Sequence, residues 1–334
     1  MRSIQALLIA TFVSLYSFMC CTLVQADYFA SIRDSYFDSG NNNIALLSDS
    51  GVVLDANFVD PVHLAGPTGM AVVGNSLFVA NAFDNTIVKF DATTGAYGGV
   101  FADASDGLNG PSALEYRDGN FYVANLGSPA TLAFGTDVLK INAASGVAST
   151  FKAGLKGPSG LLFDSSGNLF VSEFDAYSGP EFHVTAFDAS GAVVLGPLTD
   201  SLLAGPTGLA FNADGDLLIA AVNGSRVVRY DGAFSTYVDL SSSSAFPSGI
   251  FVTGPNSFWV FDSAFAGLFG YTIDGLGNPQ PQGLVASYFN FGYATPPELG
   301  LGIGDIVGVP EPSGLMLLSV ASLLMLVRRR RRCQ

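Results

Sequence analysis

The central part of this 334-residue chain lacks the residue types that most often carry out chemistry in proteins. The three cysteines, Cys20, Cys21 and Cys333, all lie near the ends of the chain. The residues between them therefore form no disulfide, no thiolate nucleophile and no cysteine metal site. Only two histidines are present, His63 and His183, which is too few for a histidine-rich zinc site. No serine has an evident base, and no G-x-x-x-x-G-K-[ST] phosphate loop occurs, so we predict no catalytic residues.

Positive charge is also scarce. Of the 14 basic residues, six are Arg2 and the run Arg328–Arg332, which leaves eight between Asp27 and Val309. That stretch contains 27 of the 28 acidic residues and has a net charge of −19. Such a surface repels phosphates and anionic membranes, which excludes nucleic acid as a partner. Aromatic residues make up 12% of the chain, a content that argues against disorder.

The first 26 residues have the layout of a secretory signal peptide. Met1 and Arg2 begin a short positive region, and an apolar run follows from about residue 6 to residue 23. Small residues then stand at the offsets that signal peptidase requires, so we expect cleavage between Ala26 and Asp27. A permanent anchor helix is the alternative interpretation.

The last 25 residues, 310–334, form a three-part tail. Pro310-Glu311-Pro312 is followed by a mostly apolar stretch, Gly314–Val327, and then by Arg328–Arg332. Fourteen helical residues span about 21 Å, less than the ~30 Å of a hydrocarbon core, and the arginines favour the cytoplasmic side. The tail closely resembles the PEP-CTERM sorting signal. That resemblance implies transient membrane insertion, recognition by an exosortase, cleavage near the Pro-Glu-Pro motif and export to the envelope or exterior, often with exopolysaccharide. A plain C-terminal anchor is the alternative.

The region between these ends, residues 27–309, is a repeat. Five segments begin with a proline followed by Ser or Thr, and the prolines are 44, 47, 48 and 41 residues apart: Pro67, Pro111, Pro158, Pro206 and Pro247. Each is followed by an apolar strand, a turn, a second strand such as LFVAN (77–81) and a third such as TIVKFD (86–91). A weaker fourth strand precedes the next start. Four short strands per repeat are typical of a propeller blade.

The two ends of this region complete one further blade. Residues 28–31 resemble a second strand without a first strand before it, while Pro297–Ile303 resembles a first strand without successors. Pairing the two would close the ring and remove its open edges. The sequence therefore predicts an all-β, six-bladed propeller closed by a C-terminal strand, with helices confined to the terminal signal and anchor segments.

The order of motifs resembles NHL-repeat and gluconolactonase-like six-bladed propellers, and residues 77–95 also resemble the repeats of surface-layer proteins. The gluconolactonase resemblance implies a divalent metal held by Glu, Asn and Asp side chains just before the glycine that opens each first strand. The corresponding residues here are Thr68, Ser112, Ser159, Thr207, Ser248 and Leu299. Hydroxyl groups bind a hard cation poorly, so we expect that metal site to be absent.

Two sets of polar residues are predicted at the face where the first strands begin and the second strands end. The first set is a ring of channel-mouth hydroxyls at Thr68, Ser112, Ser159, Thr207 and Ser248. The second set consists of candidate ligand-binding residues at Asn81, Asn125, Glu173 and Asp262. Loops on a rigid scaffold often carry binding sites. The structural alternative is that the hydroxyls bond nearby backbone, that Asn and Asp form turns and that Glu173 forms a salt bridge. The oxygen-rich segment 38–43 could bind Ca²⁺, although a plain polar loop is favoured.

These observations favour an exported, non-catalytic propeller that acts as a binding or matrix module at the cell envelope or exterior. A glycan, an exopolysaccharide or an envelope protein would be its partner, and signal peptidase and an exosortase would process it. One alternative is a divalent-metal lactonase or hydrolase that uses Glu173, Asp262, Asn81 and Asn125. Another is a self-associating surface-layer protein.

Overall fold

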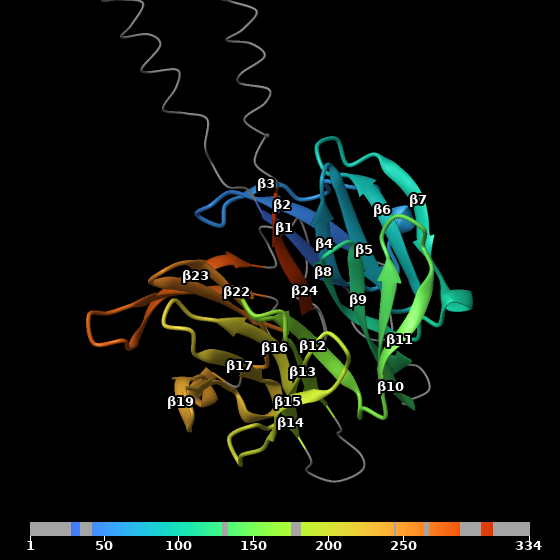
Figure 1. The fold of residues 1–334 in the computed structure, drawn as a ribbon. Coiled ribbons are helices and arrows are strands. Elements are labelled where there is room, and N and C mark those ends of the chain that lie inside the picture. The colour runs from blue at the N-terminus through green and yellow to red at the C-terminus, as the bar shows by residue number, and fades with distance from the viewer. Residues whose placement is uncertain are drawn as a thin grey trace, which may run out of the picture.

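Six four-stranded antiparallel sheets surround a common centre in the computed structural model (Figure 1). The structure describes residues 28–33, 42–128, 133–174, 182–243, 245–263, 267–287 and 302–309. Strands rich in β-branched and aromatic residues build every sheet, as the pleated surface favours. The predicted six-bladed propeller is confirmed, with only short 3-10 helices in the described ranges: η1 (Pro61–His63), η2 (Ala104–Asp106), η3 (Val222–Gly224) and η4 (Ser241–Ser243).

The blades are numbered along the chain, and each is given from its inner to its outer strand. Blade 1 contains β24 (Gly302–Gly308), β1 (Tyr28–Arg33), β2 (Asn43–Leu47) and β3 (Val53–Asp55); blade 2 contains β4 (Pro67–Val73), β5 (Ser76–Asn81), β6 (Thr86–Asp91) and β7 (Tyr97–Ala102); blade 3 contains β8 (Pro111–Arg117), β9 (Asn120–Ser128), β10 (Ala133–Asn142) and β11 (Ala148–Ala153). Blade 4 contains β12 (Pro158–Phe163), β13 (Leu169–Glu173), β14 (His183–Phe187) and β15 (Val193–Leu198); blade 5 contains β16 (Pro206–Phe211), β17 (Leu217–Ala221), β18 (Arg226–Tyr230) and β19 (Phe234–Asp239); blade 6 contains β20 (Pro247–Gly254), β21 (Ser257–Asp262), β22 (Gly267–Ile273) and β23 (Pro279–Ser287). The five repeated prolines thus each begin an inner strand, as the repeat predicts.

A C-terminal strand closes the ring, but it lies further along the chain than the sequence indicates. β24 pairs with β1 in antiparallel register, with Tyr28 opposite Gly308 and Ala30 opposite Ile306. It begins at Gly302, five residues after Pro297, where the predicted strand begins. This placement buries Ile306, which is 3% exposed, in the cluster that joins blades 6 and 1. Residues 297–301 lie outside the described residues.

The signal peptide and the sorting tail also lie outside the described residues, as do Ala26, Asp27, Pro310, Glu311 and Pro312. These assignments stay predictions. Within the ranges that the structure describes, no helix has the length and hydrophobicity needed to cross a membrane.

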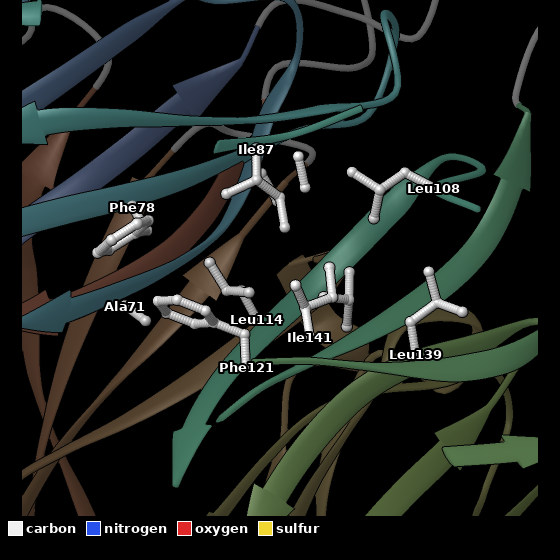
Figure 2. Packing of buried hydrophobic residues seen from close by; sticks show 11 residues of the cluster. Ala71, Phe78, Ile87, Leu108, Leu114, Phe121, Leu139 and Ile141 are labelled. Atoms are coloured by element: carbon white, nitrogen blue, oxygen red, sulfur yellow. The ribbon is translucent and has the colours of Figure 1, made fainter. Parts of the chain in front are cut away.

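The hydrophobic core is divided into six clusters, one at each interface between neighbouring blades. Figure 2 shows the cluster between blades 2 and 3, where Phe78 and Ile87 of one blade meet Phe121 and Ile141 of the next. Trp259, the single tryptophan, is 6% exposed and belongs to the cluster between blades 6 and 1. Because each sheet buries both faces against its neighbours, no blade has a complete core of its own.

Hydroxyl groups connect successive blades near the start of the inner strands. Ser31 Oγ donates to the backbone oxygen of Thr68 (2.7 Å), and Thr68 Oγ1 donates to that of Pro111 (2.7 Å). Ser112 Oγ then donates to the backbone oxygen of Ser159 (2.9 Å). These contacts run from blade 1 to blade 4 and satisfy buried carbonyl groups that would otherwise be unpaired.

Gly160 shows why the repeated motif favours glycine after Ser or Thr. A Cβ atom built on Gly160 would lie 2.1 Å from the backbone oxygen of Thr207 in the next blade. The same backbone is held close by Ser172, whose Oγ accepts from Gly160 N (2.8 Å) and donates to the Thr207 oxygen (2.6 Å). Any side chain at position 160 must therefore push blades 4 and 5 apart.

We expect Gly160→Val to lower the free energy of unfolding by about 3 kcal/mol, because it overpacks a backbone-to-backbone contact. Gly275 is the matched control, because a Cβ atom there meets no atom within 4 Å. Urea unfolding of Gly160→Val and Gly275→Val would measure both effects. Equal stability of the two variants would contradict close contact between blades 4 and 5.

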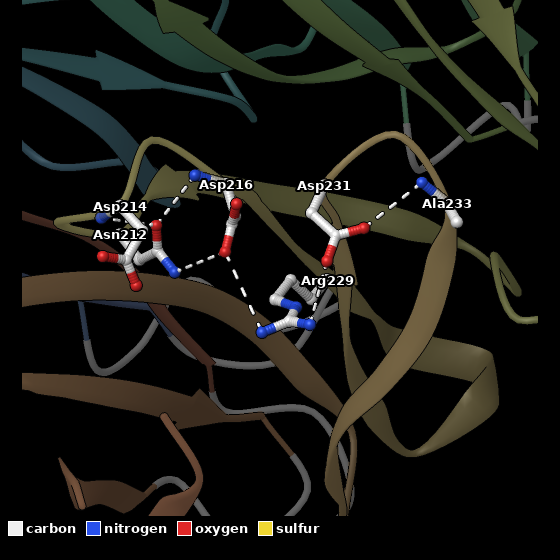
Figure 3. Close-up of polar contacts among 6 residues, drawn as sticks. All are labelled: Asn212, Asp214, Asp216, Arg229, Asp231 and Ala233. Carbon is white, nitrogen blue, oxygen red and sulfur yellow. Dashed lines mark hydrogen bonds and ion pairs between the residues drawn. The ribbon is translucent and has the colours of Figure 1, made fainter. Parts of the chain in front are cut away.

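Aspartate and asparagine side chains close many of the outer turns, which explains much of the acidic composition. Figure 3 shows one example in blade 5, where Asn212 Oδ1 accepts from the backbone of Asp214 (3.1 Å) and Asp216 (2.8 Å). Arg229 lies between Asp216 and Asp231, at 3.9 and 2.9 Å. These carboxylates act within turns at the surface, where Asp and Asn hydrogen-bond local backbone.

Candidate functional site

The inner strands of all six blades enclose a central channel. The cavity has a volume of about 1130 Å³, and its described lining comes from β4, β8, β12, β16, β20, β24 and the loops next to them. This volume is slightly above the usual range for small-molecule sites, about 300–1,000 Å³. We call the end at which β4, β8, β12, β16 and β20 begin the loop-rich mouth, because the connections after the second strands also open there.

Aromatic side chains stand at the loop-rich mouth. Phe134, Phe174 and Phe246 line the cavity from blades 3, 4 and 6. The ring centroids of Phe134 and Phe174 are 6.2 Å apart in an edge contact, and Phe246 is 42% exposed. Polar groups are interspersed with them, since Asn223 and Ser263 also line this end. The mouth therefore offers flat apolar surfaces beside hydrogen-bonding groups.

The five channel-mouth hydroxyl residues predicted from the sequence all line the cavity. Several of these hydroxyls are engaged by protein: Thr68 and Ser112 bond to the next blade, and Thr207 Oγ1 donates to the backbone oxygen of Ala220 (3.4 Å). Ser248 differs, because its Oγ is buried and has no hydrogen-bond partner among the described residues. The blade-to-blade contacts of Thr68 and Ser112 agree with the structural alternative for those two residues.

The four candidate ligand-binding residues each lie in a different blade and are at most 3% exposed: Asn81, Asn125, Glu173 and Asp262. They are absent from the described lining of the cavity. Each bonds instead to the connection that precedes the inner strand of its own blade. Asn81 and Asn125 donate from Nδ2 to the backbone oxygens of His63 (3.1 Å) and Gly107 (2.9 Å). Their role as ligands stays a prediction, and the contacts present hold the connection before the inner strand.

The two acidic members of this set hold their connections as acceptors. Glu173 Oε2 accepts from Lys156 N (2.7 Å), and its Oε1 lies 2.8 Å from His183 Nε2. Asp262 Oδ1 accepts from Phe246 N (3.0 Å). The contact with His183 differs from the water-facing salt bridge expected for Glu173, because Glu173 is buried.

No group of three or more His, Cys, Asp or Glu residues comes together among the described residues. His63 stacks on Tyr97, with ring centroids 3.5 Å apart, and lies in η1 before blade 2, whereas His183 begins β14 of blade 4. In the segment considered for Ca²⁺, only Asn42 and Asn43 are described, and Asn43 Nδ2 donates to Asn57 Oδ1 (2.9 Å). Ca²⁺ binding at that segment stays a prediction.

Two carboxyl groups in the channel wall were missed by the sequence analysis. Glu115 on β8 and Asp305 on β24 are the only acidic residues in the described lining of the cavity, which contains no Lys, Arg or His. Asp305 Oδ2 accepts from Met70 N (2.7 Å), and Oδ1 accepts from Ile306 N (2.8 Å). Glu115 makes no hydrogen bond through its carboxyl group among the described residues.

Burial controls the protonation of this pair. Burial and, as the smaller cause, the nearby charge of Asp305 together raise the pKa of Glu115 to about 8. Burial also raises the pKa of Asp305 to about 7, against the opposing effect of the bonds from Met70 N and Ile306 N. Both residues nevertheless keep an intermediate exposed fraction, because the cavity reaches their side chains. The channel wall therefore holds acidic groups that gain or lose protons near neutral pH.

A signal for this pair was present in the repeat. The position of Glu115 is occupied by Ala71, Leu162 and Ala210 in three of the other inner strands, so a carboxylic acid there breaks an apolar pattern. Asp305 was missed because the predicted closing strand ended at Ile303.

The sequence matches no protein-family model and no curated protein. The fold is similar to that of a chain in a nidogen/laminin complex, with a TM-score of 0.62 and 12% identity over 86% of this chain and 99% of that one. It is also similar to a catalytically inactive virginiamycin B lyase from Staphylococcus aureus solved with quinupristin (TM-score 0.55, 13% identity, 84% and 94% covered). A candidate 6-phosphogluconolactonase from Bacteroides uniformis gives a TM-score of 0.53 at 13% identity, with 77% and 82% covered. These similarities agree with a β-propeller fold, whose six blades are given by the sheets of this chain. That fold serves both binding modules and enzymes.

Proposed function

We propose that this chain is an exported, non-catalytic propeller that binds a glycan at the loop-rich mouth of its central channel. It would act as a binding or matrix module at the cell envelope or exterior. The observation that carries the proposal is the cavity of about 1130 Å³ with Phe134, Phe174 and Phe246 at its mouth. A sugar ring has an apolar C–H face and a rim of hydroxyl groups. Aromatic rings beside polar groups complement both features.

Export forms the second part of the proposal and rests on the motifs at the two ends of the chain. Signal peptidase would release the body at Asp27, and an exosortase would process the tail at Pro310-Glu311-Pro312. Exopolysaccharide is then the glycan that the protein would meet.

Phe246→Ala should weaken glycan binding about fivefold, because it removes an exposed ring of the mouth whose contact contributes about 1 kcal/mol. The bond from Phe246 N to Asp262 involves only backbone at position 246 and is preserved. Isothermal titration with a panel of neutral and charged oligosaccharides would measure the effect.

Val147→Ala provides the control for this substitution. Val147 is 67% exposed at the turn between β10 and β11 and is not part of the described channel lining. We expect it to leave the dissociation constant unchanged. The proposal fails if no oligosaccharide of the panel binds, or if Phe246→Ala and Val147→Ala bind equally well.

A further inference from the structure

Glu115 and Asp305 face the channel from two blades that are not neighbours. Glu115 belongs to β8 of blade 3 and Asp305 to β24 of blade 1, and both inner strands contact β4 of blade 2. Asp305 is bonded to Met70 N of β4. Gly69 of β4 lies close to the backbone of Leu114, the residue before Glu115, because a Cβ atom built on Gly69 would meet Leu114 N. The two carboxyl groups therefore lie at the same level of the channel, on either side of β4.

The pair has no positive partner within the described protein. The described lining contains no basic residue, and the carboxyl group of Glu115 makes no hydrogen bond there. Asp305, in contrast, is oriented by two backbone amides, Met70 N and Ile306 N. Buried acidic groups are normally paired with a cation or a hydrogen-bond donor. Asp305 has such donors, whereas Glu115 presents its carboxyl group to a cavity of about 1130 Å³, from which a ligand can supply the missing partner.

We propose that Glu115 and Asp305 form the charged subsite of the channel and bind a primary ammonium group carried by the ligand. This inference rests on the proposed glycan-binding function, and it names the ligand as an amino sugar with a free amine. An ammonium group is a compact cation with three donors, which two carboxyl groups can share.

The surroundings of the pair favour an organic cation over a metal ion. The described lining of the cavity is otherwise uncharged and includes apolar residues such as Val72, Leu162 and Phe251, which suit the carbon skeleton of a ligand. Ca²⁺ takes six to eight oxygen ligands, whereas this site offers two carboxyl groups and no third acidic or histidine ligand among the described residues. The unpartnered Ser248 Oγ in the same lining can accept from or donate to a sugar hydroxyl.

Binding of the ammonium group should release a proton. Near neutral pH the pair holds at least one proton, since burial raises the pKa of Glu115 to about 8 and that of Asp305 to about 7. A bound cation stabilises the ionised carboxylates, so the proton leaves for the solvent as the ammonium group enters. The net charge of the site then changes little, and the released proton can be measured.

The test compares two probes that differ only in amine acetylation. Isothermal titration of the full-length chain at pH 6.5 uses the β-1,4-linked trimer of glucosamine and the matching trimer of N-acetylglucosamine. We expect the free amine trimer to bind at least tenfold more tightly than the acetylated trimer. Binding enthalpies measured in buffers of different ionisation enthalpy should show that about one proton is released per bound trimer. We expect Glu115→Gln and Asp305→Asn to remove this preference. Far-UV circular dichroism spectra that match the wild-type spectrum would show that both variants fold.

Equal binding of the two trimers, or a preference that survives in Glu115→Gln, would overturn the ammonium subsite while leaving glycan binding in place. Failure of both trimers to bind would overturn it as well, and other oligosaccharides that bind and depend on Phe246 would still support the proposed function. CaCl₂ that displaces the free amine trimer at a concentration lower than that of the trimer itself would assign the pair to a metal ion instead.

Discussion

A chain that ends at residue 301 should lose at least about 10 °C of melting temperature relative to a chain that ends at residue 309. The shorter chain lacks β24, the inner strand of blade 1, and leaves β1 as an open edge. It also removes Ile306 from the cluster with Ala30 and Leu268. Loss of one buried isoleucine and of a full strand ladder costs about 5 kcal/mol, and 1 kcal/mol corresponds to roughly 2–4 °C in a domain of this size.

Two further measurements identify ring closure as the cause. Hydrogen exchange should accelerate first in β1 and in β21, whose Trp259 and Phe261 pack in the same cluster, while β9 and β13 keep their protection. Ile306→Ala in the longer chain should lower the free energy of unfolding by about 2–5 kcal/mol without removing any backbone bond. A 301-residue chain that melts together with the 309-residue chain would show that the propeller does not depend on this closure.

Periodicity allowed the architecture to be predicted because every blade repeats the same local physics. A turn that starts with proline, a buried strand and a short polar hairpin recur at nearly constant spacing. The closing strand was harder to place, because Pro297-Glu298-Leu299-Gly300 resembles the repeated start, whereas the strand that pairs with β1 runs from Gly302 to Gly308. Only the pairing of β1 with β24 shows that Ile306 is the residue buried against Ala30.

The candidate site was harder to predict because side-chain direction at strand ends is set by bulges. The pairing of inner and second strands changes register just after the first proline, between Pro67 and Met70 in blade 2 and between Pro158 and Leu161 in blade 4. Such bulges re-aim the neighbouring side chains. Asn81 and Glu173 accordingly bond the connection before the inner strand.

The carboxyl pair in the channel could not be found from spacing at all. Glu115 and Asp305 are separated by most of the chain and come together only because ring closure places β24 beside β4. A single acidic residue in an apolar strand shows only that the repeat pattern is broken at that position. Two such residues on either side of one strand define a site, and that relation exists only in the closed propeller.

Raising the pH from 5 to 8 should destabilise the wild-type chain through the same two groups. Burial raises the pKa of Glu115 from 4.5 to about 8 and that of Asp305 from 3.8 to about 7. Between these values the folded chain binds protons that the unfolded chain has already lost. The free energy of unfolding therefore falls as pH rises, by about 1.4 kcal/mol per pH unit for each such proton. Below about pH 3 both states are protonated, and the pair no longer contributes to the slope.

The double variant Glu115→Gln/Asp305→Asn should remove most of this slope, because amides of the same shape do not titrate in this range. The side-chain oxygen of the amide introduced at position 305 still accepts from Met70 N. Asp118→Asn is the control, since that side chain is 90% exposed at a turn of blade 3. Urea unfolding at pH 5, 6, 7 and 8 measures all three chains. If the free energy of unfolding of the double variant depends on pH as strongly as that of the wild type, groups other than Glu115 and Asp305 take up the protons. A slope that disappears in the double variant alone would show that the closed ring holds two acids in their protonated form, ready to exchange a proton for a cation.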